Sequence, residues 1–138
     1  NPLYFGKSTL QGHGTGGNLG QGLLAMEESF NDIASNIDSN EVTIISFLGG
    51  GMSGGLQYLI NKLMSFGKTI RVIVTLPSSL EGPIRRRQAF EVLGAISAIG
   101  CELIIVDDEQ VFKTNKDIQS IKELYKLIDE IVYQCSCK

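Results

Sequence analysis

Short runs of β-branched and aliphatic residues alternate along the chain with longer segments in which apolar residues recur every three or four positions. The short runs predict buried strands at 42–48, 69–76 and 102–106, with a further short strand at 3–5. The helical spacing predicts amphipathic helices at 19–37, 56–65, 84–99 and 118–132. Gly67 and Gly100 are expected to end two of these helices, and Pro77 to end a strand.

The order of these elements alternates strand and helix, which predicts an α/β fold. Parallel strands joined by right-handed helical crossovers give a Rossmann-like, doubly wound parallel sheet. In such sheets ligands bind beyond the carboxyl ends of the strands, and both glycine clusters of this chain lie at the starts of predicted helices. Because 138 residues leave no room for two cores, we expect residues 1–138 to form a single domain.

Composition and charge restrict the class of protein. Hydrophobic residues make up 43% of the chain and charged residues 20%, which is ordinary for a globular domain. The net charge of -3 gives no basic field for DNA or RNA, with residues 85–87 (three arginines) as the local exception. No apolar run has the length of a membrane span, and three cysteines do not form a disulfide framework. We therefore expect a cytoplasmic protein without direct nucleic-acid binding.

The segment 49–55 has five glycines in seven residues and joins a predicted strand to a predicted helix. Small residues let the backbone approach a ligand and turn its N–H groups inward, and the helix N-terminus adds positive charge. This arrangement favours an anion such as phosphate over the alternative of a flexible turn that binds nothing. It is not a Walker loop, since no Gly-Lys-Ser/Thr follows.

A second glycine-rich segment, 12–18, precedes the helix predicted at 19–37. A polyphosphate needs donors from more than one side, so two such loops at one sheet edge support each other. His13 is the single histidine of the chain and is interpreted as an incidental loop residue. Neither a metal site nor a serine-hydrolase site is predicted, because Cys135 and Cys137 are a poor zinc signal and Ser53 lacks a nucleophile-elbow pattern.

With these residues in view, the chain resembles FtsZ, the bacterial homologue of tubulin, over nearly its whole length. Residues 12–18 with 22, 25 and 27–29 are similar to the GLGAGGN loop of the family and its following helix, and residues 49–55 to the tubulin signature GGGTGTG. Thr75-x-Pro77 and Glu81-Gly82-x-x-Arg85 match the family's TxPFxFEGxxR stretch. Tyr125 and Asp129 stand where the family has a phenylalanine and, four residues later, an aspartate.

The resemblance implies that these blocks bind GTP or GDP. Facing the terminal phosphate would be Gly14, Thr15, Gly16, Gly17 and Asn18. Backbone donors around the phosphates would come from Gly49, Gly50, Gly51, Met52, Ser53, Gly54 and Gly55. Glu81 would accept from the ribose hydroxyls, and Arg85 would lie along the ribose or base. Tyr125 would stack on the purine, and Asp129 would select guanine, because adenine has no donor at N1.

Plain structural interpretations stay open beside these roles. Tyr125 is also suited to a helix core, Asp129 to a solvated surface, and Arg85 with its two neighbours to an exposed helix start. The chain also departs from the family's pattern. Met52 and Gly54 replace the two threonines of the signature, Ser53 its middle glycine, and Leu19 a proline. Asp107 stands where the family usually has asparagine before Asp108, which is expected to add charge near the base.

Two parts of the family's pattern are missing from this sequence. No strand with its own glycine-rich loop precedes Leu3, and the chain does not reach the synergy loop, whose acidic residue completes the neighbouring subunit's site. We therefore expect a GTPase domain that is incomplete on its N-terminal side. The strand at 42–48 should then have an unpaired, apolar inner edge, which is an aggregation liability.

The sequence predicts the guanine-nucleotide-binding portion of an FtsZ/tubulin-like cytoskeletal GTPase that polymerises head to tail. Its ligand would be GTP or GDP, with Mg²⁺ as an accompanying ion, and its partners would be other subunits of the same kind. We assign no catalytic residue and expect little hydrolysis by this chain alone. One alternative is a degenerate FtsZ-like module that binds without hydrolysis, which Met52 favours. Another is an unrelated Rossmann-like enzyme acting on a nucleotide or phosphorylated substrate.

Overall fold

A computed structural model describes residues 18–137 of the chain, apart from the side chain of Met52. The predicted strand at 3–5 and the predicted phosphate-facing residues Gly14 to Gly17 lie outside the described residues. The helices are α2 (Leu19–Ser35), α3 (Leu56–Ser65), α4 (Pro83–Ser97), α5 (Asp108–Thr114) and α6 (Ile121–Ser136). The strands are β1 (Glu41–Phe47), β2 (Thr69–Leu76) and β3 (Glu102–Asp107), and two 3-10 helices are η1 (Gly51–Gly55) and η2 (Ser79–Glu81).

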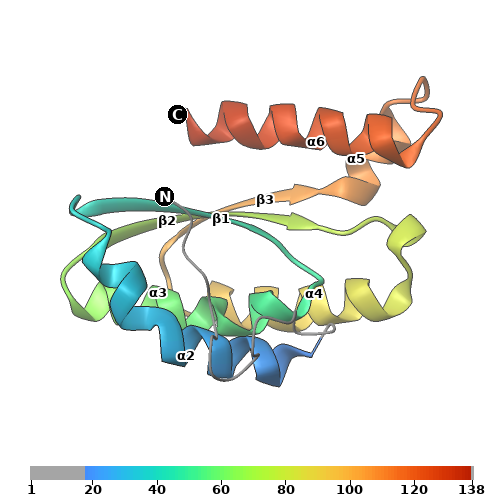
Figure 1. Cartoon of the computed structure of the whole chain (residues 1–138). Helices are drawn as coiled ribbons and strands as arrows, with labels where there is room; N and C mark the ends of the chain where they lie inside the picture. The colour runs from blue at the N-terminus through green and yellow to red at the C-terminus, as the bar shows by residue number, and fades with distance from the viewer. Residues whose placement is uncertain (1–17, 138) are drawn as a thin grey trace.

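The three strands form one parallel sheet in the order β1-β2-β3. Helices α2, α3 and α4 lie on one face of the sheet, and α5 and α6 lie on the other (Figure 1). Phe47 pairs with Thr75, and Thr75 pairs with Val106, so the three strands end at nearly the same level. This architecture confirms the predicted Rossmann-like α/β fold with parallel strands and helical crossovers.

Strand β2 is the centre of the core because it is buried on both faces. Ile70, Val72, Val74 and Leu76 pack against α3 and α4, whereas Ile73 points to the opposite side. There it meets a second cluster formed with Val106, Leu124, Ile128 and Val132, most of it supplied by α6. A strand with two buried faces requires a continuous apolar run, which is what the sequence of β2 provides.

The start of α6 differs from the predicted start at residue 118 because a side-chain N-cap fixes it three residues later. Ser120 Oγ accepts a hydrogen bond from the N–H of Glu123 at 3.2 Å. In return, the Glu123 carboxylate accepts from the N–H of Gln119 at 2.9 Å. The Ser120 contact satisfies an N–H group that the first turn of a helix leaves unpaired, and the Glu123 contact holds the residue before the N-cap, so the helix begins at Ile121.

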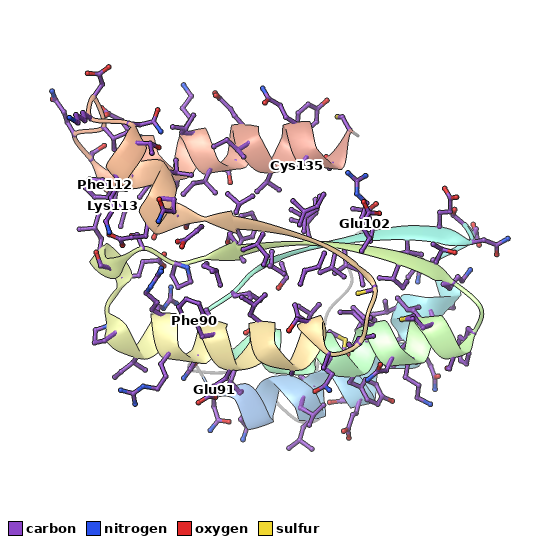
Figure 2. The ribbon with its side chains drawn as sticks, turned by 180° about the vertical axis from the view of Figure 1, so that it is seen from behind. Phe90, Glu91, Glu102, Phe112, Lys113 and Cys135 are labelled. Carbon is purple, nitrogen blue, oxygen red and sulfur yellow. The ribbon has the colours of Figure 1, made fainter. Side chains whose placement is uncertain are left out.

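The far end of α6 is fastened to the sheet by Arg71 of β2. The Arg71 guanidinium donates to the carbonyl oxygen of Cys135 at 2.6 Å and lies 3.7 Å from a carboxylate oxygen of Glu102. Cys135 and Glu102 accordingly lie at one end of the molecule, opposite Phe112 and Lys113 of α5 (Figure 2). The register of α6 over the sheet is thereby fixed at both ends.

Strand β1 is an edge of the sheet within residues 18–137, where it pairs with β2 alone. Alternate side chains of this strand are exposed, with Ile45 at 44% and Phe47 at 56% of their full accessible surface. The sequence predicted an apolar edge at this strand, and the described part of the chain has it. Phe47 is also the last residue of β1, so it stands next to the ligand-binding end of the sheet.

Candidate functional site

A cavity of about 420 Å³ lies at the carboxyl ends of the strands, between the first turn of α4 and the second and third turns of α6. Its wall comes from β1, β2 and the loops that follow them, and from η2, α4, α5 and α6. The lining residues are Phe47, Leu48, Gly50, Thr75, Pro77, Glu81, Arg85, Asp108, Tyr125, Ile128 and Asp129. Five residues predicted from the sequence to contact nucleotide are among them, namely Gly50, Glu81, Arg85, Tyr125 and Asp129.

Two glycines with positive φ shape the entrance to this cavity. Gly49, which follows β1, has φ +109°, and a β-carbon there would lie 3.3 Å from the carbonyl oxygen of Arg85 and from Pro77. Gly82 has φ +95° and precedes the first residue of α4. Both positions require a residue without a side chain, because left-handed backbone is costly for other residues. Together they bring the start of α4 close to the end of β1.

Glu81 and Arg85 form an ion pair across the first turn of α4, with 2.9 Å between Arg85 Nη1 and Glu81 Oε1. The carboxylate is shielded, with 13% of its side-chain surface exposed, whereas the guanidinium is 56% exposed. Burial and the nearby Glu81 carboxylate raise the pKa of Tyr125, so Glu81 lies against the aromatic wall of the cavity. In the absence of ligand, therefore, the predicted ribose acceptor is already held in place by Arg85.

Tyr125 and Asp129 lie one turn apart on α6, which places both on the same face of the helix. Leu124 and Ile128 bury the adjoining stripe of α6 in the core, and this fixes the direction in which the two polar residues point. Tyr125 remains 39% exposed at the cavity. The structure thus gives Tyr125 and Asp129 a shared cavity, and the interpretation of Tyr125 as a core residue is wrong.

Asp108 is a charged lining residue that the sequence did not place at the site by name. It begins α5 directly after β3, and 4% of its surface is exposed. Its Oδ1 atom has no hydrogen-bond partner among the residues that the structure describes. Burial and the neighbouring Glu81 carboxylate raise its pKa to about 7. Thr75, Pro77 and Asp108 stood in motifs noticed in the sequence, but none was predicted to contact ligand.

Asp107 was expected to add charge near the base, and in the structure its carboxylate is paired. Both oxygens of its carboxylate contact Arg86, at 3.2 and 3.3 Å, and one also accepts from the N–H of Glu109 at 3.0 Å. Asp107 is therefore engaged as the N-cap of α5 and as the partner of Arg86. The pocket wall contains Asp108 instead, because the one-residue step from strand to helix turns the next side chain inward.

The three consecutive arginines have three different environments. Arg85 pairs with Glu81, and Arg86 holds the end of β3 through Asp107 and the end of β2 through the carbonyl oxygen of Pro77, at 2.6 Å. Arg86 also lies over the ring of Phe90, 5.1 Å from its centroid. Arg87 is exposed and has no recorded partner in residues 18–137. The positive charges of Arg85 and Arg86 are therefore neutralised by the carboxylates of Glu81 and Asp107.

Replacing Arg86 with alanine should lower the free energy of unfolding by about 1–2 kcal/mol, because Asp107 would lose a charged partner while remaining beside Asp108 and Glu109. Urea denaturation measures this effect. Arg87→Ala is the matched control, since it removes the same side chain from an exposed position of the same helix. Equal stability losses in the two variants would contradict a bracing role for Arg86.

The glycine-rich segment 49–55 folds differently from the open loop expected. Residues 51–55 form the 3-10 helix η1, and of this segment Gly50 lines the cavity. Ser53 is buried, and its hydroxyl donates to the carbonyl oxygen of Gly50 at 2.7 Å. In this structure the Ser53 hydroxyl is therefore used in an internal hydrogen bond. Gly49, Gly51 and Met52 stay predicted phosphate contacts.

Gly54 and Gly55 are small for a reason that the sequence did not reveal. A β-carbon on Gly54 would lie 2.0 Å from the carbonyl oxygen of Leu19, and one on Gly55 would lie 2.5 Å from the β-carbon of Met26. Helix α2 therefore rests directly on η1. The space on the β-carbon side of these two glycines is filled by α2, and their predicted backbone contacts with phosphate stay predictions.

Asn18, the described residue of the first glycine-rich segment, caps helix α2. Its side-chain oxygen accepts a hydrogen bond from the N–H of Gln21 at 3.0 Å. This contact stabilises the helix N-terminus. A phosphate contact by the same residue stays a prediction. The interpretation of its neighbours Gly14, Thr15, Gly16 and Gly17 also stays a prediction, since they lie outside the described residues.

The chemistry of the cavity suits a ligand with a flat aromatic part and hydrogen-bond donors. Tyr125 offers a ring face, Asp129 an acceptor, and the Glu81–Arg85 pair an acceptor and a donor at its side. Within residues 18–137 no group of three or more histidine, cysteine or acidic side chains is arranged to hold a metal ion. None of the described helices is both long and apolar enough to cross a membrane.

Comparison with known proteins finds relatives along nearly the whole chain. The sequence is 31% identical over 132 residues to the cell division protein FtsZ of Helicobacter pylori, which covers 94% of this chain and 34% of the relative. It is 30% identical over 132 residues to cell division protein FtsZ 1 of Methanocaldococcus jannaschii, covering 94% of this chain and 36% of that protein. A mitochondrial division protein of Dictyostelium discoideum is 27% identical over 137 residues, or 96% of this chain and 37% of its own.

Solved structures give the same result for the fold. An FtsZ dimer of M. jannaschii matches with a TM-score of 0.83 and 30% identity, over 93% of this chain and 38% of that chain. The GDP-bound monomer of CetZ1 from Haloferax volcanii matches with a TM-score of 0.81 and 25% identity, over 95% of this chain and 42% of that chain.

The chain spans about a third of the length of the curated relatives it matches. No protein-family model matches it. The relatives nevertheless agree with one another, and the matched solved structures share the parallel sheet and its helices. The ordered sequence blocks, the fold and these relatives together show that this chain is similar to part of the FtsZ proteins of the tubulin-like family.

Proposed function

We propose that the cavity at the carboxyl ends of the strands binds a guanine nucleotide, as part of an FtsZ-like GTPase domain. The observation that carries this proposal is the convergence of Glu81, Arg85, Tyr125 and Asp129, from η2, α4 and α6, on one cavity beside Gly50. These residues form two pairs that lie far apart in the sequence, and the sequence predicts a nucleotide contact for each residue. The GDP-bound state of the related CetZ1 structure supports the same ligand class.

The base would lie against α6. Tyr125 presents a partly exposed ring for stacking, and Asp129, one turn further on, presents a carboxylate on the same face of the helix. A carboxylate accepts from both the N1–H and the amino group of guanine. Adenine lacks a donor at N1, so it would leave one carboxylate oxygen unpaired. This difference gives the cavity its proposed preference for guanine.

The sugar and phosphates would lie toward α4 and the glycine-rich segment. Glu81 would accept from ribose hydroxyls while its pair with Arg85 keeps the carboxylate oriented. The backbone around Gly50, with nothing within 4 Å of the position of its β-carbon, leaves room for phosphate oxygens. Any Mg²⁺ would be held largely by those phosphates and water, as is usual for this ion in nucleotide sites. When bound, it would supply neutralisation of phosphate charge.

Assembly is the second part of the proposal. FtsZ of M. jannaschii is related to this chain and forms a dimer in its solved structure. We propose that the whole protein associates head to tail with subunits of the same kind, and that hydrolysis uses a group from the next subunit. No catalytic residue is assigned within residues 18–137. A module that binds nucleotide without hydrolysing it remains the alternative, which Met52 favours.

Replacing Asp129 with alanine should weaken GDP binding by about 1–3 kcal/mol, because the guanine donors would lose a charged acceptor. The binding of GTP, GDP and ATP is measured by calorimetric titration of the whole 138-residue chain. Glu130→Ala is the matched control, because Glu130 is the adjacent acidic residue and lies outside the cavity wall. Unchanged GDP affinity in the Asp129 variant, or equal affinity for ATP and GTP in the original chain, would refute the assignment.

A further inference from the structure

Asp108 is a buried acid in the cavity wall that lacks a hydrogen-bond partner for one of its oxygens. Its exposed fraction is 4%, and Oδ1 contacts no donor among the described residues. The neighbouring Asp107 has a structural role, and both of its carboxylate oxygens have partners. They contact Arg86, and one also accepts from a backbone N–H. An unpaired buried oxygen is costly to the fold. Its position in a ligand-sized cavity points to a partner that arrives with the ligand.

The charged groups around Asp108 come from every element that packs against it. Glu81 of η2, Asp107 at the end of β3 and Asp129 of α6 are acidic and disfavour its ionised form. Arg86 of α4 is the opposing cation, but it is already paired with Asp107. Arg85, the other nearby cation, is paired with Glu81. Burial contributes more than any of these charges, and the combined effect raises the pKa of Asp108 to about 7.

A neutral carboxyl group differs from a carboxylate in what it can contact. The neutral acid has one O–H donor and a carbonyl acceptor, whereas the carboxylate accepts only. Asp129 and Glu81 already supply two carboxylates to the same cavity. A third acceptor would face a ligand whose donors are used by the other two, while a donor at Asp108 would match the ring nitrogens and hydroxyl oxygens of a nucleoside.

We propose that Asp108 contacts the bound nucleotide as the neutral acid, so that binding takes up a proton and is strongest below neutral pH. This inference rests on the proposed function of the cavity. A nucleotide in the cavity covers the remaining exposed surface of Asp108 and adds negatively charged phosphates to a site that already contains three acids. Both changes disfavour the carboxylate further. Affinity is then retained below the pKa of the free protein and declines as the pH rises through it.

Calorimetric titration of the 138-residue chain with GDP, over about pH 6 to about pH 8, tests the inference. We expect affinity to fall about tenfold across this range, and we expect Glu130→Gln to show the same profile. In Asp108→Asn the decline should be lost, because the amide does not titrate. The diphosphate of GDP titrates in the same range, but it does so equally for all three proteins, so the difference between them reports on Asp108.

A second measurement does not depend on the variant. Titrations at about pH 8 in buffers of different ionisation enthalpy count the protons exchanged, and about one proton should be taken up per GDP bound. GDP binding with no proton uptake, or with the same pH profile in the original chain and in Asp108→Asn, would overturn the inference and leave the proposed function standing. Failure of GDP to bind at any pH would overturn the proposed function, and the inference with it.

Discussion

Replacing Gly54 with alanine should lower the free energy of unfolding by about 3 kcal/mol or more, at the upper end of the range for overpacking. The added β-carbon would lie 2.0 Å from the carbonyl oxygen of Leu19 and 2.8 Å from its α-carbon. These are backbone atoms, so no side chain can rotate away. Relief requires α2 to move away from η1, which would open the buried contacts of Met26 and Phe30.

Gly94→Ala is the matched control for this prediction. Gly94 lies within α4, and nothing lies within 4 Å of the position of its β-carbon. Alanine there should stabilise the protein by about 0.5–1 kcal/mol, because glycine is the poorer residue in a helix interior. If α2 rests on η1 as described, urea denaturation will give changes of opposite sign in the free energy of unfolding of the two variants. A Gly54→Ala variant as stable as the original chain would contradict that packing.

The glycine-rich segment shows where the sequence was ambiguous. Glycine is favoured both where a ligand approaches the backbone and where another helix does, and composition does not separate the two cases. The structure separates them along one short segment. Gly50 faces open space and the cavity, whereas Gly54 and Gly55 face α2. The partner of a glycine is a property of tertiary structure, and here it lies about thirty residues upstream in the chain, at Leu19 and Met26.

The large elements of the fold were predictable because their signals are strong and periodic. Each predicted strand within residues 18–137 is present, and the long helices lie where the apolar spacing placed them. Helix α5 was missed because it has seven residues, too few for a repeating apolar pattern. The signal that was available is local. Asp107 caps the helix, and the two acidic residues after it occupy its first turn, where the helix dipole favours negative charge.

The site was predictable to the extent that its residues belong to motifs. Glu81, Arg85, Tyr125 and Asp129 do, and the structure brings them to one cavity. Asp108 was not assigned, because the choice between it and Asp107 depends on which side chain the strand-to-helix step turns toward the cavity. Sequence patterns fix such a choice within a regular strand or helix, but not at the single residue where one becomes the other.

Replacing Asp108 with asparagine should stabilise the protein at pH 8, by an amount that grows as the pH rises from about 4 to about 7. The pKa of Asp108 is raised from its ordinary value of 3.8 to about 7 in the folded chain, so the folded state holds a proton that the unfolded state releases. Stability is therefore lost as the pH rises between these values and is level above them. The full difference corresponds to about 4 kcal/mol, which the amide avoids because it has no proton to lose.

Urea denaturation of the ligand-free chain at about pH 4.5 and about pH 8 measures this difference, and the comparison of variant with original at each pH cancels the titrating groups that do not interact with Asp108. Asp107→Asn is the informative counterpart, because it weakens the contacts with Arg86 and should destabilise the protein by about 1 kcal/mol. Neighbouring aspartates would then respond to the same substitution with opposite signs. Asp108→Asn could also prove no more stable than the original chain at pH 8. The ionised Asp108 carboxylate of the original chain would then need a stabilising partner in the folded state, as Asp107 has, and the assignment of Asp108 as an unpaired acid would be wrong.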